Sequence, residues 1–112
     1  MVNYKTFLIL PIFKNNKFSQ NDIFNQKNFI FRSSETRSLV SALNASIVFE
    51  KIINISVPKS SLLINNNVAN EIKNNFDLSL VDLIIFDCSL SPIQQRNLER
   101  ILQKKIIDRT QL

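Results

Sequence analysis

The sequence contains no glycine, no histidine and a single cysteine, Cys88, among its 112 residues. Without glycine, neither a GxxxxGK[ST] phosphate loop nor a GxGxxG dinucleotide-binding loop can form. Without histidine, a Ser–His triad and a His-ligated metal site are both excluded. One cysteine makes neither an internal disulfide nor a thiolate cluster. We therefore predict that this chain holds no catalytic, cofactor-binding or metal-binding residue and is not an enzyme by itself.

The composition is that of one soluble globular domain spanning residues 1–112, with 45% apolar and 21% charged residues. The net charge of +5 is concentrated in residues 1–32, which carry five cations and one anion. A basic segment of this kind suits RNA or an anionic membrane, and it equally suits a solvated lysine-rich loop. The apolar stretch from Phe7 to Phe13 is far too short to span a membrane. We expect a cytoplasmic protein without a membrane segment.

Apolar runs and helical spacings alternate along the chain. Buried strands are predicted at residues 6–10, 47–55 (one strand or two) and 81–86, with a last strand beginning at Ile106. Helices are predicted after a cap at Ser33 or Ser34, and between Val68 and about Asn75. Residues 14–31 show no period and are predicted to be a loop. The order β-α-β-α-β-α-β predicts an α/β domain with a mostly parallel four-stranded sheet flanked by helices.

A third helix has the clearest start signal in the chain. Ser91 can cap it, Gln94 can complete a capping box, and Pro92 occupies the first helical position. Apolar residues then recur at Leu98, Ile101 and Leu102. This segment therefore predicts a helix that packs one side against the sheet.

The carboxy-terminal third of the chain resembles the amino-terminal domain of the HflX-type GTPases. The resemblance is carried by three stretches: Asp82-Leu-Ile-Ile-Phe-Asp87, Leu90-Ser-Pro-Ile-Gln-Gln-Arg-Asn-Leu-Glu99 and Lys105-Ile-Ile-Asp-Arg-Thr110. The family loop with two glycines and two lysines aligns with residues 64–72, where this chain has asparagine or valine at those four positions. Asparagine tolerates positive φ, so the turn can persist although the lysines are lost.

The resemblance implies a domain of ribosome-associated GTPases that bind the large ribosomal subunit. In that family GTP and Mg²⁺ bind a separate GTPase domain, which residues 1–112 lack. We therefore expect a stand-alone, non-catalytic domain that binds the large subunit or its rRNA. Two alternatives remain open: a remnant or split-gene fragment without activity of its own, and one half of a two-chain GTPase whose partner chain supplies the GTPase domain. An ATP-binding enzyme is a weaker reading, because no residue here would carry hydrolysis.

Two groups of residues are candidates for a role. For ribosome, RNA or interdomain contact the candidates are Asn65, Asn66, Asn67, Gln94, Gln95, Arg96, Asn97 and Arg109. For a structural role they are Ser91, Pro92, Asp87 and Asp108. Capping alone accounts for part of the first group, and Arg96 can instead pair with Asp87 or Asp108. An ion pair with the preceding helix is the favoured interpretation of Asp108 and Arg109.

Overall fold

Four parallel strands form one sheet in the computed structural model, which describes residues 3–13, 22–55 and 57–111, with residues 22–30 and 32 described by their backbone alone. The strands are β1 (Tyr4–Phe13), β2 (Ala45–Ile55), β3 (Leu83–Phe86) and β4 (Lys105–Asp108). They lie in the order β2-β1-β3-β4. The predicted α/β domain with a four-stranded parallel sheet is confirmed.

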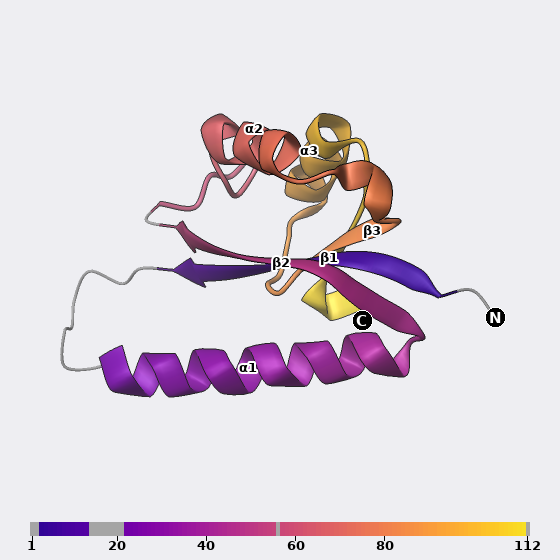
Figure 1. Cartoon of the computed structure of the whole chain (residues 1–112). Helices are drawn as coiled ribbons and strands as arrows, with labels where there is room; N and C mark the ends of the chain where they lie inside the picture. The colour runs from indigo at the N-terminus through magenta and orange to yellow at the C-terminus, as the bar shows by residue number, and fades with distance from the viewer. Residues whose placement is uncertain (1–2, 14–21, 56, 112) are drawn as a thin grey trace.

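Helices cover both faces of the sheet. The connecting helices are α1 (Asp22–Ala42), α2 (Asn66–Asn75) and α3 (Pro92–Leu102), and short 3-10 turns form η2 (Leu78–Leu80) and η3 (Arg109–Gln111). Figure 1 shows α2 and α3 together on one face and α1 alone on the other. Two of the three crossovers therefore run over one face, and the sheet is buried from both sides.

The larger core lies between the sheet and the α2–α3 layer. Among the described residues, sixteen buried side chains form it. At its centre three phenylalanine rings meet edge to face: Phe7, Phe49 and Phe76 have centroid separations of 4.7 to 5.6 Å. Each such pair contributes about 0.5–1.5 kcal/mol beyond the burial of its surface. This aromatic contact ties β1, β2 and the end of α2 into one unit.

Among the described residues, the core under α1 is smaller. Leu8 and Leu10 of β1, Ile85 of β3 and Val40 of α1 are its buried members among the described residues. Successive residues of β1 thus point to opposite cores, as the continuous apolar run predicts. The strand also continues past Pro11 to Phe13, because β3 pairs with β1 over Thr6–Ile9 only. The predicted strand at residues 6–10 is thus too short, and Pro11 lies beyond the segment that pairs with β3.

The loop predicted at residues 14–31 is wrong from residue 22 onward. The helix α1 begins at Asp22, so Ser33 and Ser34 lie inside it rather than at its cap. The buried positions of its described part are Ser33, Thr36 and Val40. Two of these three are polar, so the hydrophobic periodicity that marks a sheet-covering helix is weak here. Residues 14–21 of the predicted loop lie outside the described residues.

Three of the described residues take the left-handed backbone conformation that glycine usually provides. Asn44 (φ 58°) turns the chain between α1 and β2, and Gln103 (φ 56°) ends α3. Leu63 (φ 74°) closes a tight turn in which it exchanges main-chain hydrogen bonds with Lys59. Asparagine accepts this conformation more readily than leucine or glutamine does.

Residues 45–55 form one strand, which settles the choice between one strand and two. An irregularity in its pairing with β1, between Thr6 and Phe7, changes the face to which its side chains point. Ile47 therefore packs against the core under α1, whereas Phe49 packs against the other core.

Among the described residues, no helix combines the length and the apolar character needed to cross a membrane.

Candidate functional site

The start of α3 carries the predicted capping box. Ser91 Oγ accepts a hydrogen bond from the Gln94 N–H (3.1 Å), and Gln94 Oε1 accepts one from the Ser91 N–H (2.9 Å). Pro92 occupies the first turn, where its missing N–H has no intrahelical partner to lose. Together these contacts satisfy donors that the helix start would otherwise leave open. They orient α3 without need of a ligand.

The candidate residues Gln94, Gln95, Arg96 and Asn97 form a polar patch on α3, and most of them make contacts within the fold. Three amide side chains each donate to a main-chain carbonyl elsewhere in the fold: Gln94 to Lys59 (2.8 Å), Gln95 to Ile106 (2.7 Å) and Asn97 to Ser61 (2.7 Å). Gln95 also donates to the side chain of Gln111 (3.2 Å). These amides hold the 58–64 loop on one side and β4 with η3 on the other. We assign them to the architecture rather than to a ligand.

Arg96 is the member of this patch that faces solvent. It is exposed, as is Arg100 one turn later. Ile93, one turn before Arg96, is also 56% exposed, so the outer side of α3 presents an apolar residue followed by two guanidinium groups. Among the described residues, no carboxylate lies within ion-pair distance of either arginine. Both charges are therefore available to an external anion.

The asparagine run at the start of α2 divides in the same way. Asn65 caps the helix, since its Oδ1 accepts a hydrogen bond from the Val68 N–H (2.8 Å). Asn66 and Asn67 follow in the first turn and are exposed. Their amides have both donors and acceptors to offer. Asn65 is thus structural, whereas its two neighbours are surface groups.

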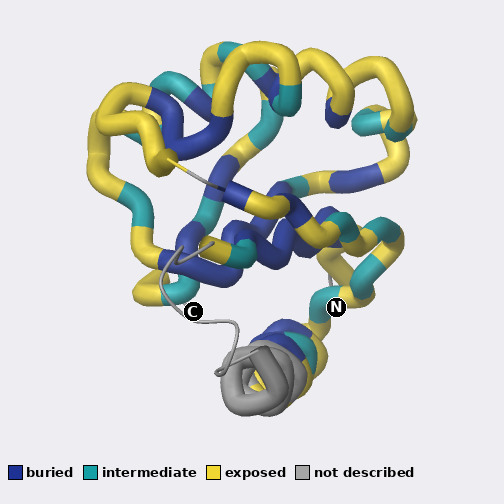
Figure 2. Tube along the Cα trace, turned by 90° about the vertical axis from the view of Figure 1, so that its left-hand side faces the viewer, coloured by how far each residue is buried: buried dark blue, intermediate teal, exposed yellow. Residues whose placement is uncertain are grey.

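Six exposed polar residues of the two helices define what we call the α2–α3 outer surface. They are Asn66, Asn67, Asn70, Lys73, Arg96 and Arg100. The two helices lie next to each other on the same side of the sheet (Figure 1). Turned by 90°, the chain shows exposed stretches along the outside of this layer (Figure 2). The acidic Glu71 of α2 is held by Lys51 of β2 at 3.6 Å. The surface is therefore rich in amides and carries unpaired positive charge.

A second polar group, the Asp87 cluster, lies at the carboxyl end of the sheet. It consists of Glu35, Thr36, Asp87 and Arg109. The Asp87 carboxylate is 1% exposed and accepts hydrogen bonds from the Thr36 hydroxyl (2.7 Å) and from Arg109 (3.2 Å). Arg109 also forms an ion pair with Glu35 at 3.3 Å. A buried carboxylate needs such partners because desolvation disfavours its charge.

Asp87 pairs with Arg109 rather than with Arg96, so the proposed pairing of Arg96 with Asp87 is wrong. The adjacent Asp108 accepts hydrogen bonds from the Leu90 N–H (2.9 Å) and the Thr110 hydroxyl (2.7 Å). Asp108 thereby fixes the loop that leads into α3. Arg96 points away from these carboxylates because it lies on the solvent side of α3. The expected ion pair with the preceding helix is also wrong in its partner, because Arg109 pairs with Glu35 of α1 and with Asp87.

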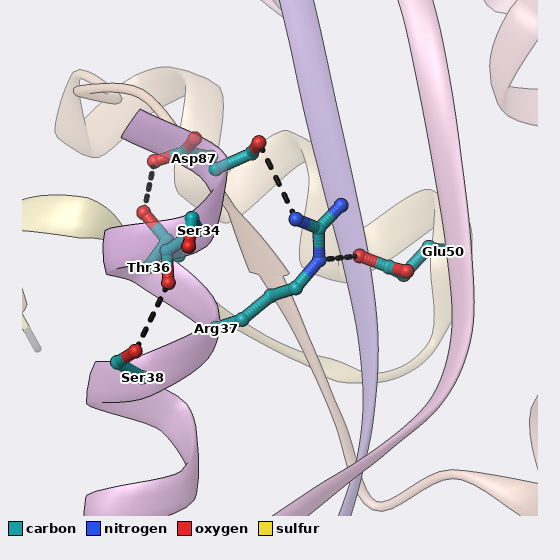
Figure 3. Close-up of polar contacts among 7 residues, drawn as sticks. Ser34, Thr36, Arg37, Ser38, Glu50 and Asp87 are labelled. Atoms are coloured by element: carbon teal, nitrogen blue, oxygen red, sulfur yellow. Dashed lines mark hydrogen bonds and ion pairs between the residues drawn. The ribbon is translucent and has the colours of Figure 1, made fainter. Parts of the chain in front are cut away.

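Figure 3 shows how α1 reaches this end of the sheet. Thr36 points to Asp87, and Arg37 reaches Glu50 of β2 at 2.6 Å. Ser38 turns back to the main chain of Ser34 and takes no part in the contact with the sheet. The helix therefore contacts the sheet through residues on one side, and hydroxyl and charged groups carry much of this contact.

Sequence reasoning did not find Glu35 and Thr36 as partners of the carboxyl-end residues. Thr36 lies 51 positions before Asp87, and no local pattern joins the two. The available signal was the spacing of Ser33, Thr36 and Val40, which places a small polar stripe on the buried side of a helix. Among the described residues, no group of three potential metal ligands occurs. The cluster has no evident nucleophile and base pair, so it offers architecture rather than chemistry.

Comparisons with known proteins agree with this architecture. Residues 32–112 match the family described as GTP-binding GTPase N-terminal. A crystal structure of a mutation variant of SsGBP is similar with a TM-score of 0.60 and 19% sequence identity. That match covers 96% of this chain but only 29% of the SsGBP chain, and at this identity it shows a shared fold. A search of curated proteins gives no match.

Proposed function

This chain belongs to the GTP-binding GTPase N-terminal family, the amino-terminal domain of HflX-type GTPases, and from that premise we propose that it is a non-catalytic RNA-binding domain. The proposed target is the large ribosomal subunit, contacted through rRNA. The proposed contact is the α2–α3 outer surface. In this proposal any GTP and Mg²⁺ chemistry belongs to a GTPase domain outside residues 1–112, and this chain contributes recognition.

The observation that carries the proposal is the pair Arg96 and Arg100. Both guanidinium groups are exposed on consecutive turns of α3, and the described residues offer them no carboxylate. Guanidinium groups bind phosphate oxygens with two parallel hydrogen bonds. The neighbouring Asn66 and Asn67 can contact phosphate, ribose hydroxyl or base edges, because amides both donate and accept.

The rigidity of α3 also supports a binding role. The capping box and the amides of Gln94, Gln95 and Asn97 fix this helix to two neighbouring segments. A preorganised helix loses little conformational entropy when a ligand binds its outer side. The family loop has two lysines that this chain lacks. The cations of the α2–α3 outer surface are therefore Lys73, Arg96 and Arg100.

The test is a salt titration of binding between the purified chain and large-subunit rRNA. We expect affinity to fall steeply between about 50 and about 200 mM salt because each phosphate contact releases counterions. Replacing both arginines, R96Q with R100Q, should weaken binding at low salt and reduce the salt slope by about 2. The matched control K5Q removes an exposed cation from the start of β1 and should bind like the unmodified chain.

Two results would contradict the proposal. No binding of the folded chain to rRNA at about 50 mM salt would reject RNA recognition itself. Equal binding by the R96Q/R100Q variant and the K5Q variant would reject the α2–α3 outer surface as the contact. A separate GTPase-domain chain remains the alternative partner. An exposed apolar edge near residues 106–112 would support that alternative; in the described part of this segment Ile106 is buried and Ile107 is half-buried.

A further inference from the structure

The strand β4 lies at one end of the strand order β2-β1-β3-β4, so it forms an edge of the described sheet. It pairs with β3 over its whole length, from Lys105 to Asp108. In a parallel pair, alternate residues turn their N–H and C=O groups toward the neighbouring strand, and the residues between turn theirs away. An edge strand therefore offers main-chain groups with which another chain can pair.

Two glutamine side chains bond to main-chain groups of this edge. Gln95 Nε2 of α3 donates to the carbonyl of Ile106 (2.7 Å). Gln111 Oε1 of η3 accepts a hydrogen bond from the N–H of Asp108 (3.3 Å). Gln95 Nε2 also donates to Gln111 Oε1 (3.2 Å), so the two amides bond to each other as well. We call these two side chains the amide pair.

The amide pair reproduces the hydrogen bonds of one residue in a fifth parallel strand. A residue in such a strand donates its N–H to one carbonyl of the strand beside it and accepts the N–H two residues further along. On β4 these two groups are the Ile106 carbonyl and the Asp108 N–H, which the amide pair occupies. A glutamine side chain carries both donors and an acceptor, so two of them suffice for this pattern. The β4 edge is therefore closed by side chains from α3 and η3.

We infer that the β4 edge is a strand-pairing surface for a second copy of this chain, and that the amide pair holds this surface closed. Two β4 strands can pair antiparallel about a two-fold axis at Ile106. This register uses the main-chain groups of Ile106 and Asp108, so the amide pair must leave before the strands can join.

The charges of β4 favour a second copy as the occupant. In the register centred on Ile106, Asp108 of each copy lies opposite Lys104 of the other, and Lys105 lies opposite Ile107. Opposite charges therefore face each other across the pair, and no like charges do, which stabilises cross-strand pairing. Gln95 and Gln111 are not members of the α2–α3 outer surface, so this inference is independent of what that surface binds.

Sedimentation equilibrium of the purified chain over a range of concentrations tests the inference. The double variant Q95A/Q111A frees the Ile106 carbonyl and the Asp108 N–H. It should self-associate about tenfold or more tightly than the unmodified chain, because a pairing strand no longer competes with two hydrogen bonds in each copy. Asn97→Ala is the matched control, since Asn97 lies on the same helix and donates an equivalent bond to the Ser61 carbonyl (2.7 Å). It should leave self-association unchanged.

Amide hydrogen exchange followed by NMR locates the contact. In the associated double variant, the N–H groups of Ile106 and Asp108 should become protected as the protein concentration rises. The inference is overturned if Q95A/Q111A and Asn97→Ala self-associate equally, or if association leaves both N–H groups unprotected. It is overturned equally if the Asp108 N–H of the unmodified chain exchanges as fast as a free amide, because the amide pair would then not be formed. That last measurement decides the matter even if the double variant does not fold.

Discussion

At the residue scale, this chain shows how polar side chains take over tasks that glycine and apolar residues usually perform. Gln103 and Asn44 occupy left-handed positions, and Asn65 caps α2. Thr36 occupies a buried helix position and bonds to Asp87. A polar side chain in a buried position needs a hydrogen-bond partner, which an apolar residue would not need. The one buried side-chain atom without a hydrogen-bond partner among the described residues is the Thr6 hydroxyl.

The variant Thr6→Val should therefore be more stable than the unmodified chain. Thr6 is fully buried in β1, and a valine has nearly the same volume without the unsatisfied hydroxyl. We expect a gain of about 1 kcal/mol in the free energy of unfolding. Urea denaturation measures it. Thr6→Ser is the control: it keeps a hydroxyl and removes a methyl group, so it should be less stable. If Thr6→Val instead had a lower free energy of unfolding than the unmodified chain, the Thr6 hydroxyl would have a hydrogen-bond partner in solution.

Asp77 gives the fold a predictable response to acid. The pKa of Asp77 lies below its ordinary value of 3.8. Hydrogen bonds from the hydroxyl and from the main-chain N–H of Ser79 lower it most, and the charge of Lys104 lowers it further. A lowered pKa means that the folded state favours the carboxylate. The Asp77 carboxylate therefore stabilises the folded state above pH 3.8, and this stabilisation is lost as pH falls through the lowered pKa. The side chain is fully exposed, so the effect on stability is small.

Unfolding measured between about pH 2 and pH 6 tests this response. The unmodified chain should lose its advantage over Asp77→Asn below the ordinary pKa of 3.8, because asparagine does not titrate. Above that pH the difference between the two proteins should be constant. A difference that instead grows toward low pH would contradict a lowered pKa for Asp77.

At the element scale, the helices differ in how their positions are fixed. The outer helix α3 has a capping box, three amide contacts to neighbouring segments and buried Leu98 and Leu102. The helix α1 is longer, and its described part contacts the sheet through the buried Thr36 and Val40. The fixed position of α3 suits it to present charges to a ligand.

The capping box permits a direct prediction for α3. Ser91→Ala removes the acceptor for the Gln94 N–H and should cost about 1 kcal/mol of stability. Ser89→Ala alters an exposed serine outside the box and should cost much less. Thermal and urea unfolding of the two variants compare them. Equal stability of Ser91→Ala and Ser89→Ala would contradict the role of the capping box.

Sequence reasoning succeeded for the elements whose signals are local. The strand predicted at residues 81–86 contains the apolar run Leu83–Phe86, which forms β3, and Ser91, Pro92 and Gln94 lie within four positions of one another. The position of α1 was missed because residues 22–31 show no apolar period and its buried side includes Ser33 and Thr36. The roles of Gln95 and Asn97 were not predictable, since their partners lie 11 and 36 residues away in the sequence. The sequence alone does not distinguish a helix amide that bonds to a neighbouring loop from one that faces solvent.

At the scale of the whole molecule, the two sides of the sheet present different groups. The α2–α3 layer is tightly packed and carries exposed arginine and asparagine side chains. The α1 side contains the Asp87 cluster, whose members bond to one another. Substitutions can therefore address the proposed RNA contact without touching the Asp87 cluster.

The most direct test of RNA recognition is cosedimentation of the purified chain with isolated large ribosomal subunits. The measurement compares about 50 with about 200 mM salt, using the unmodified chain and the R96Q/R100Q variant. We predict that the unmodified chain migrates with the subunit at low salt and is released at high salt, and that the variant is released in both. Free migration of the folded, unmodified chain at low salt would contradict the proposed function.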